Sequence, residues 1–416
     1  MTNGNVQEKS RRGPLSNLRV LDLTLFLSGP YATQILGDLG AEVIKVETPD
    51  GEMTRRLPPY FVGSESAYFL SVNRNKRSLT VDMKNNAGRE LVRELALGCD
   101  IVVENFRPGI LKRLGLSYDD IAARKPEVVW CCISGFGQEG PYRDRPAYDM
   151  IVQAMSGSMS LTGEPEGPPV RMGIPLGDIA AGMYGVIGIL AALAERDRTG
   201  RGKLIDISML DCQVAMLSYQ AAYYLASGQV PNRQGRGHDS IPTYRVFTCG
   251  DDIDVAITAN TERMWSNLCG VLGRPDLADD ERFRTNDRRY ANRQQLWEIL
   301  EPAFRAKSAA TWVDELVAAE VPAAVVNTLD RSLNDPQVLL RNMVLAMTGP
   351  GGEQLRVAGN PVKFVGDPEP DYRYPPQLGV DNRAVLSTIL GLSRERIDAL
   401  ERDGAFGRPR PSSAAE

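Results

Sequence analysis

The sequence contains a single histidine, His238, among 416 residues. Zinc motifs such as HExxH need two histidines, so we predict no metal site. A serine or cysteine nucleophile would have His238 as its only candidate histidine base, and no GxSxG nucleophile elbow is present. Acid–base or nucleophilic chemistry therefore falls to carboxylates, lysines or tyrosines.

Cysteine is also sparse, and long apolar runs are missing. Six cysteines without CxxC spacing are typical of reduced, mostly buried thiols in a cytoplasmic protein. Residues 1–17 lack the apolar stretch of a signal peptide, and the longest apolar run, 186–194, is too short for a membrane span. The net charge of −5 provides no general attraction to nucleic acid. We therefore expect a cytoplasmic protein with neither a membrane nor nucleic acid as a partner.

Strand-like and helix-like segments alternate through the first half of the chain. We predict strands at 18–23, 41–47, 78–83, 100–103, 128–134 and 204–208, with helices at 30–39, 86–97 and 209–225. This alternation predicts an α/β fold with a Rossmann-like, doubly wound and mostly parallel sheet. A nicotinamide dehydrogenase is disfavoured, because the first turn is Leu27-Ser28-Gly29-Pro30 rather than GxGxxG and Pro30 has no amide hydrogen.

Shifts in composition divide the chain into five parts. We predict a flexible arm (1–17), a large α/β domain (18–226), a small α+β domain (227–330), a segment that returns to the large domain (331–403) and a disordered tail (404–416). The small domain should contain a hairpin formed by 243–249 and 254–259.

One carboxylate, Asp178, stands at the start of an apolar helix that runs to about Ala194. It can be an N-cap, because its oxygen can accept the free amide protons of the first turn. It can also be a nucleophile at the positive end of the helix dipole. With an unperturbed pKa of about 3.9 such a group is ionised at pH 7 without any special device.

Short motifs occur in a fixed order between residues 17 and 400. They are VLDL (20–23), SGP (28–30), GDLGAEVIKVE (37–47), NKRS (75–78), ENFRPG (104–109), GFG (135–137), GPY (140–142), Gly177-Asp178 and DPQV (335–338). Together they resemble the class III coenzyme A transferases, the formyl-CoA and carnitine-CoA transferase family. The resemblance implies a large CoA-binding domain, a smaller domain and a homodimer whose two chains are interlocked like links.

The resemblance also implies a mechanism. Asp178 would attack an acyl-CoA thioester to give a mixed anhydride, and the released thiolate would form an aspartyl-CoA thioester that transfers CoA to a carboxylic acid. No tightly bound cofactor is implied, since coenzyme A enters as part of the substrate. Residues at matching positions would contact CoA: Leu27, Ser28, Val81, Asp82, Met83, Lys84, Asn105, Phe106, Arg107, Arg113, Ala147, Tyr148 and Asp149. From the residues alone, Lys84 and Arg113 can equally be solvated surface charges.

Two longer stretches, 61–76 and 237–241, resemble the branch that moves CoA from succinyl-CoA to dicarboxylates such as glutarate. Leu27 stands where the formyl-CoA branch has a glutamine, so formate and oxalate are not expected as substrates. Arg236 and His238 would suit the distal carboxylate of a dicarboxylate, although both can also be a solvated linker.

Two alternatives remain open. A 2-methylacyl-CoA racemase has the same fold, but family racemases have a histidine where Tyr148 stands, and tyrosine is a poor base at pH 7. The other alternative is a non-catalytic acyl-CoA-binding protein, against which Asp178 is the main argument.

Overall fold

The computed structural model describes residues 13–407, which form two compact units. Unit 2 consists of Met159–Arg171 and Tyr223–Arg341, and unit 1 contains the remaining described residues. Unit 2 therefore starts slightly earlier than the predicted small domain, ends later, and includes a segment at 159–171 that the composition did not indicate.

Of the predicted arm and tail, the structure describes only residues 13–17 and 404–407. Residues 1–12 and 408–416 lie outside the described range. Leu15 is buried, and its N–H donates to Leu39 O at 3.0 Å. Ala405 is also buried, and its carbonyl accepts the N–H of Asp82 at 2.8 Å. Both ends of the described chain are thus packed against unit 1.

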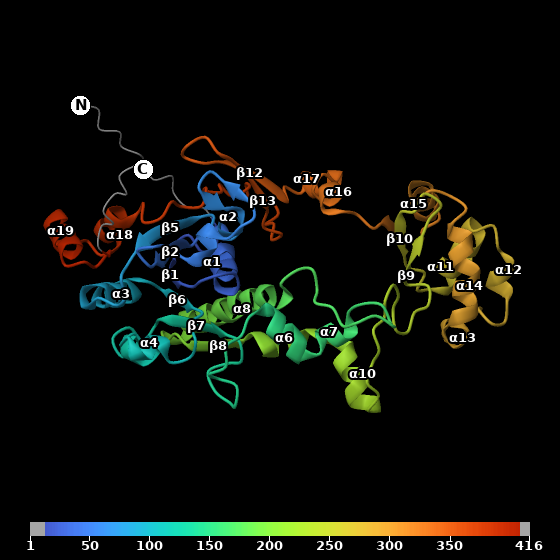
Figure 1. Ribbon diagram of the computed structural model, residues 1–416, viewed down its shortest axis with the longest axis horizontal. Coiled ribbons are helices and arrows are strands. Elements are labelled where there is room, and N and C mark those ends of the chain that lie inside the picture. The colour runs from blue at the N-terminus through green and yellow to red at the C-terminus, as the bar shows by residue number, and fades with distance from the viewer. Residues whose placement is uncertain (1–12, 408–416) are drawn as a thin grey trace, which may run out of the picture. The chain divides into compact units, whose positions relative to one another are not determined.

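Unit 1 is built on a six-stranded parallel sheet with the order β5-β2-β1-β6-β7-β8 (Figure 1). The strands are β1 (Arg19–Leu23), β2 (Glu42–Glu47), β5 (Lys76–Thr80), β6 (Ile101–Glu104), β7 (Val129–Ser134) and β8 (Leu204–Ser208). This is the doubly wound order, so the predicted α/β fold with a parallel sheet is confirmed. In such sheets the strand order reverses between β1 and β6, and ligands bind outside the carboxyl ends of the strands at that point.

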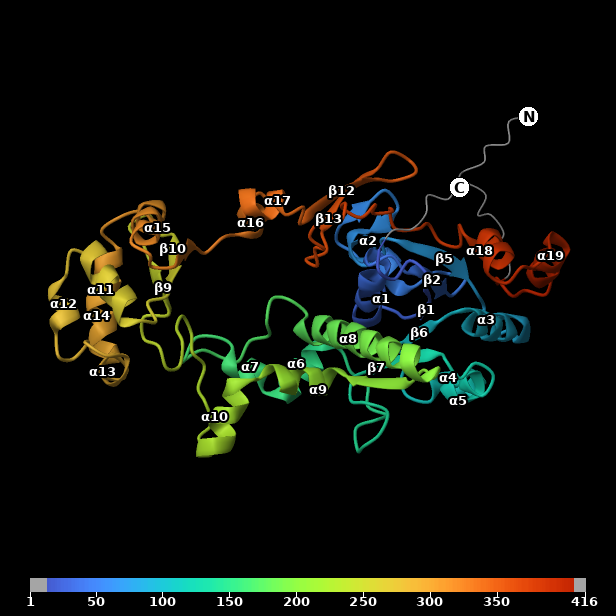
Figure 2. The ribbon, with the colours of Figure 1, turned by 180° about the vertical axis from the view of Figure 1, so that it is seen from behind.

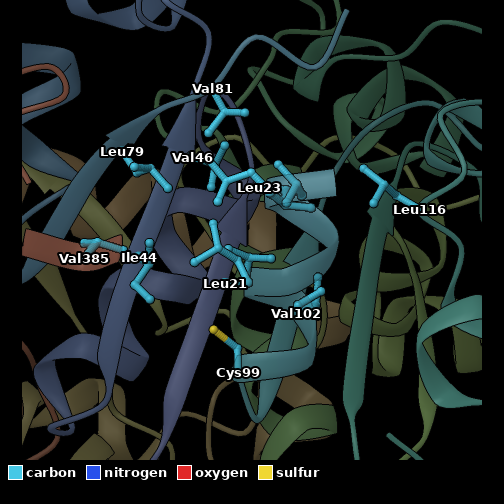
Figure 3. Close-up of a cluster of buried hydrophobic side chains, with 14 of the residues drawn as sticks. Leu21, Leu23, Ile44, Val46, Leu79, Val81, Cys99, Val102, Leu116 and Val385 are labelled. Atoms are coloured by element: carbon cyan, nitrogen blue, oxygen red, sulfur yellow. The ribbon is translucent and has the colours of Figure 1, made fainter. Parts of the chain in front are cut away.

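Side chains alternate between the two faces of the sheet, as strand geometry requires. On one face Leu21, Ile44 and Val102 belong to a single apolar cluster, which Figure 3 shows together with Val385. The helices that contribute to this cluster are α3 (Asn86–Gly98), α4 (Ile110–Arg113), α5 (Tyr118–Ala122), α18 (Asn382–Ile389) and α19 (Arg394–Arg402). The C-terminal segment therefore completes this part of the core of unit 1.

The other face of the sheet is covered by α1 (Ser28–Asp38), α8 (Leu176–Thr199) and α9 (Met209–Met216). α8 lies along β7 in both ribbon views (Figures 1 and 2). It also packs closely on α1, because a Cβ on Gly182 would lie only 2.8 Å from the carbonyl oxygen of Ser28. By length and composition α8 could cross a membrane, with a mean hydropathy of 1.8 over 18 residues. Half of that window is buried within the protein, as is typical of a core helix.

Several smaller elements complete unit 1. They are the 3₁₀ helix η1 (Met53–Arg56), the hairpins β3 (Phe61–Val62) with β4 (Glu65–Ser66) and β12 (Val344–Thr348) with β13 (Gln354–Ala358), and the helices α2 (Ala67–Ser71), α4 (Ile110–Arg113) and α6 (Asp149–Ser156). The predicted long helix over 209–225 is interrupted. Ser218, with a φ of 50°, separates α9 from α10 (Tyr219–Ser227), since this left-handed backbone cannot continue a helix.

Unit 2 contains an antiparallel sheet with the order β11-β10-β9. The predicted hairpin is present as β9 (Arg245–Thr248) and β10 (Asp254–Ile257), and β11 is Ala323–Val325. The helices are α11 (Glu262–Val271), α12 (Asp276–Asp279), α13 (Asn286–Ala291), α14 (Arg293–Phe304), α15 (Ala309–Ala318), α16 (Leu329–Leu333) and α17 (Pro336–Leu340), and α7 (Ser158–Leu161) lies at the unit boundary. All six cysteines of the chain are buried free thiols.

Candidate active site

The carboxylate of Asp178 is placed by the first turn of α8 and does not cap that helix. The N-cap position is Pro175, which makes no side-chain cap hydrogen bond. Instead, the N–H of Gly177 donates to Asp149 Oδ1 at 2.8 Å, so the aspartate that binds the helix end comes from another element. A Cβ on Gly177 would lie 2.7 Å from Val152 Cγ2, which explains the glycine. The N-cap interpretation of Asp178 is therefore wrong.

Ser28, the first residue of α1, is the direct partner of Asp178. It lies beside Asp178, where its hydroxyl and its backbone N–H favour the charged form of the carboxyl. The N-terminal turns of α1 and α8 thus meet at one carboxylate. Because free N–H groups and the positive end of the dipole lie at a helix N-terminus, this arrangement stabilises negative charge at Asp178.

The Asp178 carboxyl does not have the ordinary acidity that the sequence suggested. Burial and the neighbouring negative charge of Asp149 raise its pKa to about 7, although the hydrogen bonds from Ser28 act in the opposite direction. The prediction of an ordinary pKa was wrong because it considered only the helix dipole, which lowers the pKa. The burial that raises the pKa cannot be read from the sequence. A group with this pKa is partly ionised at neutral pH, and its charged form is a more basic nucleophile than an ordinary aspartate.

Two aromatic residues of unit 1, Tyr68 and Phe26, were not predicted as part of the site from the sequence. Tyr68, on α2, has its pKa raised to about 12 by burial and by the negative charges of Asp178, Glu52 and Asp149. Its hydroxyl is therefore protonated at neutral pH. Phe26 has a φ of 63°, an unusual value for a bulky residue, and packs edge-on against Tyr148 with 5.7 Å between the ring centroids. Nothing in the local sequence pattern marks Tyr68 or Phe26.

The residues predicted to contact CoA follow the carboxyl ends of several strands of the parallel sheet. The segment 81–84 follows β5 and 105–107 follows β6, while 147–149 leads into α6. Lys84, Arg107, Arg113 and Tyr148 are exposed, whereas Val81 is buried in the core. These segments lie at the carboxyl edge of the sheet, where ligands bind in doubly wound folds. The CoA contacts themselves stay a prediction.

Four of these residues have structural partners that the prediction did not include. Leu27 is buried, and Phe106 packs against the apolar cluster beside α3. The Asn105 side chain forms a pair of hydrogen bonds with the backbone of Leu25, both 2.8 Å long. Asp149 accepts the Gly177 N–H described above. The two polar side chains, at least, shape the site from within the protein.

Arg236 and His238 belong to unit 2, whereas Asp178 belongs to unit 1. Arg236 forms an ion pair with Asp254 and donates to Thr248 Oγ1 at 2.9 Å. The ring of His238 stacks on Tyr244 with 5.4 Å between centroids. A role in binding the acceptor carboxylate stays a prediction for both. Within residues 13–407, no three His, Cys, Asp or Glu side chains are grouped as a metal site.

Comparison with known proteins decides which family has this fold and this site. A model of CoA-transferase family III matches residues 15–382. The chain belongs to this family. The resemblance predicted from the short motifs is therefore confirmed, and membership in CoA-transferase family III makes the chain an enzyme of the CoA-transferase class.

Curated relatives and a solved structure match this family III chain along most of its length. The succinyl-CoA:glutarate CoA-transferase of Mus musculus is 41% identical and covers 93% of the chain and 89% of its own length. The acetyl-CoA:oxalate CoA-transferase of Acetobacter aceti is also 41% identical, over 87% of the chain and 92% of its own length. A CaiB/BaiF family protein from Brucella suis superposes with a TM-score of 0.81 at 38% identity, over 91% of this chain and 100% of that one. These names leave the racemase and non-catalytic interpretations without support.

The pKa of Asp178 leads to a prediction for the pH dependence of this family III enzyme. If ionised Asp178 is the attacking group, kcat/KM for the acyl-CoA rises with pH through about 7, because the carboxyl must lose its proton. Replacing Asp149 by asparagine removes a negative neighbour and should move this acid limb to lower pH, while the asparagine oxygen can still accept the Gly177 N–H. The measurement is a pH series of kcat/KM for both proteins. An acid limb at the same pH in both would contradict the assignment.

Proposed function

We propose that this enzyme transfers coenzyme A from succinyl-CoA to a dicarboxylate through a covalent aspartyl-CoA intermediate on Asp178. The observation that carries the proposal is the buried carboxyl of Asp178, which lies in the first turn of α8 beside Ser28, the first residue of α1. The succinyl-CoA:glutarate relative supports the choice of donor and acceptor class.

Each step exchanges one activated acyl group for another. An Asp178 oxygen attacks the thioester carbon of the donor, the C–S bond breaks, and CoA leaves as the thiolate. The thiolate attacks the aspartyl carbon of the resulting anhydride and releases succinate. The acceptor carboxylate then attacks the aspartyl-CoA thioester, and the expelled thiolate attacks the acceptor acyl carbon of the second anhydride, which restores the Asp178 carboxylate. Negative charge develops on oxygen at every addition, and donors such as those of Ser28 stabilise it there.

The choice of acceptor depends on Leu27 and on two stretches of the sequence. The glutarate relative and the oxalate relative have the same identity to this chain, so identity does not favour the longer acid. The expected exclusion of oxalate depends on Leu27, which is buried and whose side chain has no polar atom with which to bind a small acid. We propose glutarate as the acceptor on the basis of the two stretches that resemble the dicarboxylate branch.

An acceptor panel tests the proposed function. The purified enzyme is given succinyl-CoA and, one at a time, oxalate, malonate, glutarate, adipate and mesaconate, and the new CoA thioester is measured by mass spectrometry. We expect the largest kcat/KM with glutarate. A larger value with oxalate would overturn the acceptor assignment, and failure to transfer CoA to any carboxylic acid would overturn the proposed function.

We also propose that the enzyme is a homodimer, as the family resemblance implies. The outer face of α8 presents Met183, Ile187 and Leu190 at helical spacing, and these side chains are between 37% and 59% exposed in the chain. An uncharged, apolar helix stripe of this kind is typical of an interface between subunits. Sedimentation equilibrium should give twice the chain mass of 45.7 kDa, and Ile187→Glu should shift the population toward monomer.

A further inference from the structure

A layer of charged side chains lies buried beneath the start of α1. On the sheet face that α1 and α8 cover, Asp22 and Lys45 occupy paired positions on β1 and β2 where apolar residues are the rule. Lys76 at the start of β5 is also buried. Asp22 and Lys76 come from VLDL and NKRS, two motifs that carry the family resemblance but have no part in the chemistry described so far.

Lys76 and Asp22 bind both ends of the turn between β1 and α1. The ammonium of Lys76 has three donors and three acceptors, which are Asp22 Oδ2 at 3.0 Å, Asn73 Oδ1 at 2.9 Å and the carbonyl of Pro30 at 2.9 Å. Asp22 Oδ1 accepts the N–H of Thr24 at 2.9 Å and its hydroxyl at 2.5 Å. The turn, taken here as residues 24–30, includes the first three residues of α1, and its first and last residues are thus tied to one buried ion pair.

Lys45 and Asn105 bind the first two residues of the same turn. Lys45 Nζ donates to the carbonyl of Thr24 at 2.9 Å and pairs with Glu52 at 3.2 Å. The Asn105 amide holds the N–H and the carbonyl of Leu25, and its Nδ2 lies 3.5 Å from the hydroxyl oxygen of Ser28. We call these four side chains the turn clamp: Asp22, Lys45, Lys76 and Asn105.

The turn clamp and the start of α1 bind most of the carbonyl groups of the turn, whereas Ser28 faces Asp178. The carbonyl groups of Thr24, Leu25 and Pro30 are held from within the protein, and the carbonyl of Leu27 accepts the N–H of Tyr31 at 2.8 Å. Ser28, by contrast, packs on α8 beside Asp178, where its hydroxyl and N–H favour the charged carboxyl. The position of these two donors therefore depends on how the turn is held.

We propose that the turn clamp is a positioning device for the transfer reaction, which keeps both donors of Ser28 directed at the Asp178 carboxylate. This inference rests on the proposed function, because it assumes that Asp178 is the group that reacts. The clamp residues act through Ser28 and do not themselves touch the carboxylate. The groups that do act on Asp178 are Ser28, Asp149 and, from α2, Tyr68.

Two variants move the turn in independent ways. Lys76→Met removes three hydrogen bonds at the base of the turn while keeping a side chain of similar length. Gly29→Ala changes no charge, but the new Cβ would lie 2.3 Å from Thr24 Cγ2, so the turn must shift. We expect both to lower kcat by about 10²-fold, the loss that follows removal of one preorganised donor. We also expect the acid limb of kcat/KM to move to higher pH, because the Ser28 hydrogen bonds lower the pKa of Asp178.

Arg74→Met is the matched control. Arg74 is equally buried and paired, with Asp38 at 2.6 Å, but it binds the other end of α1 and no residue of the turn. We expect it to reduce stability and to leave the acid limb in place. In a Ser28→Ala background, Lys76→Met should lower kcat by a smaller factor than in the wild type, because the Ser28 hydroxyl that the clamp positions is already absent.

The outcomes separate the inference from the proposed function. The positioning role would be overturned if folded Lys76→Met kept a wild-type kcat and an unshifted acid limb. It would also be overturned if Arg74→Met lowered kcat and moved the acid limb as much as Lys76→Met does. If Lys76→Met does not fold, Gly29→Ala decides by the same two measurements. Activity retained in Asp178→Asn would instead overturn the proposed function.

Discussion

Asp178→Asn should abolish CoA transfer while leaving the protein folded and able to bind acyl-CoA. The amide is close to the carboxylate in size and its oxygen can still accept from Ser28, but it cannot form the anhydride that begins the reaction. We expect kcat to fall by at least about 10³-fold, as is usual when a covalent nucleophile is removed. The measurement is the initial rate with succinyl-CoA and glutarate, together with calorimetric binding of CoA.

A matched variant and a direct chemical measurement make this result decisive. Asp197→Asn changes an exposed aspartate on the same helix and should keep wild-type rates. After incubation with acyl-CoA, the wild-type peptide that contains Asp178 should carry a CoA adduct, and the Asp178→Asn peptide should not. An adduct on another peptide would place the nucleophile elsewhere.

Asp178→Asn should also make the protein more stable than the wild type, and the gain in stability should be larger at higher pH. The folded pKa of Asp178 is about 7, whereas an unfolded aspartate has a pKa of about 3.9. Between these values the native state holds a proton that the unfolded state has lost, so wild-type stability decreases as pH rises from about 4 to about 7 and then levels off. A shift of this size corresponds to at most about 4 kcal/mol, and an asparagine is free of this cost at every pH.

Urea unfolding at pH 4.5 and pH 8 measures this effect. We expect Asp178→Asn to exceed the wild type by about 1–3 kcal/mol at pH 8, after allowance for weaker hydrogen bonds from Ser28, and by much less at pH 4.5. A stability difference that is the same at both pH values would show that Asp178 titrates normally. An active site that lowers stability in this way is a familiar cost of function.

The sequence was sufficient to predict the layers of unit 1, because periodicity and alternation are local. The predicted strand at 41–47 corresponds to Glu42–Glu47, and the predicted helix at 86–97 corresponds to Asn86–Gly98. The break at Ser218 was not predicted, since the apolar pattern continues through it. Short elements such as α2 have too few residues for a periodic signal.

The site was predictable only in part, for a physical reason. Asp178 was identified from a motif, but its pKa depends on Asp149 and on burial, which are tertiary properties. Tyr68 was missed because it lies near Asp178 only in the folded chain. Asp22 and Lys45 did carry a signal, since each is a charge inside an otherwise apolar strand. Such interruptions are worth following in other parallel sheets.

The return of the C-terminal segment to unit 1 has a consequence for the growing chain on the ribosome. The amide of Ser78 on edge strand β5 bonds to Asp381 at 2.9 Å, and Val385 and Leu400 close the apolar cluster on one face of the sheet. During synthesis this part of the face stays open until α18 and α19 have been made, whereas unit 2 is already complete. A nascent polypeptide of this enzyme must therefore carry an uncovered aliphatic surface while unit 2 is being made, which makes it a natural client for a chaperone.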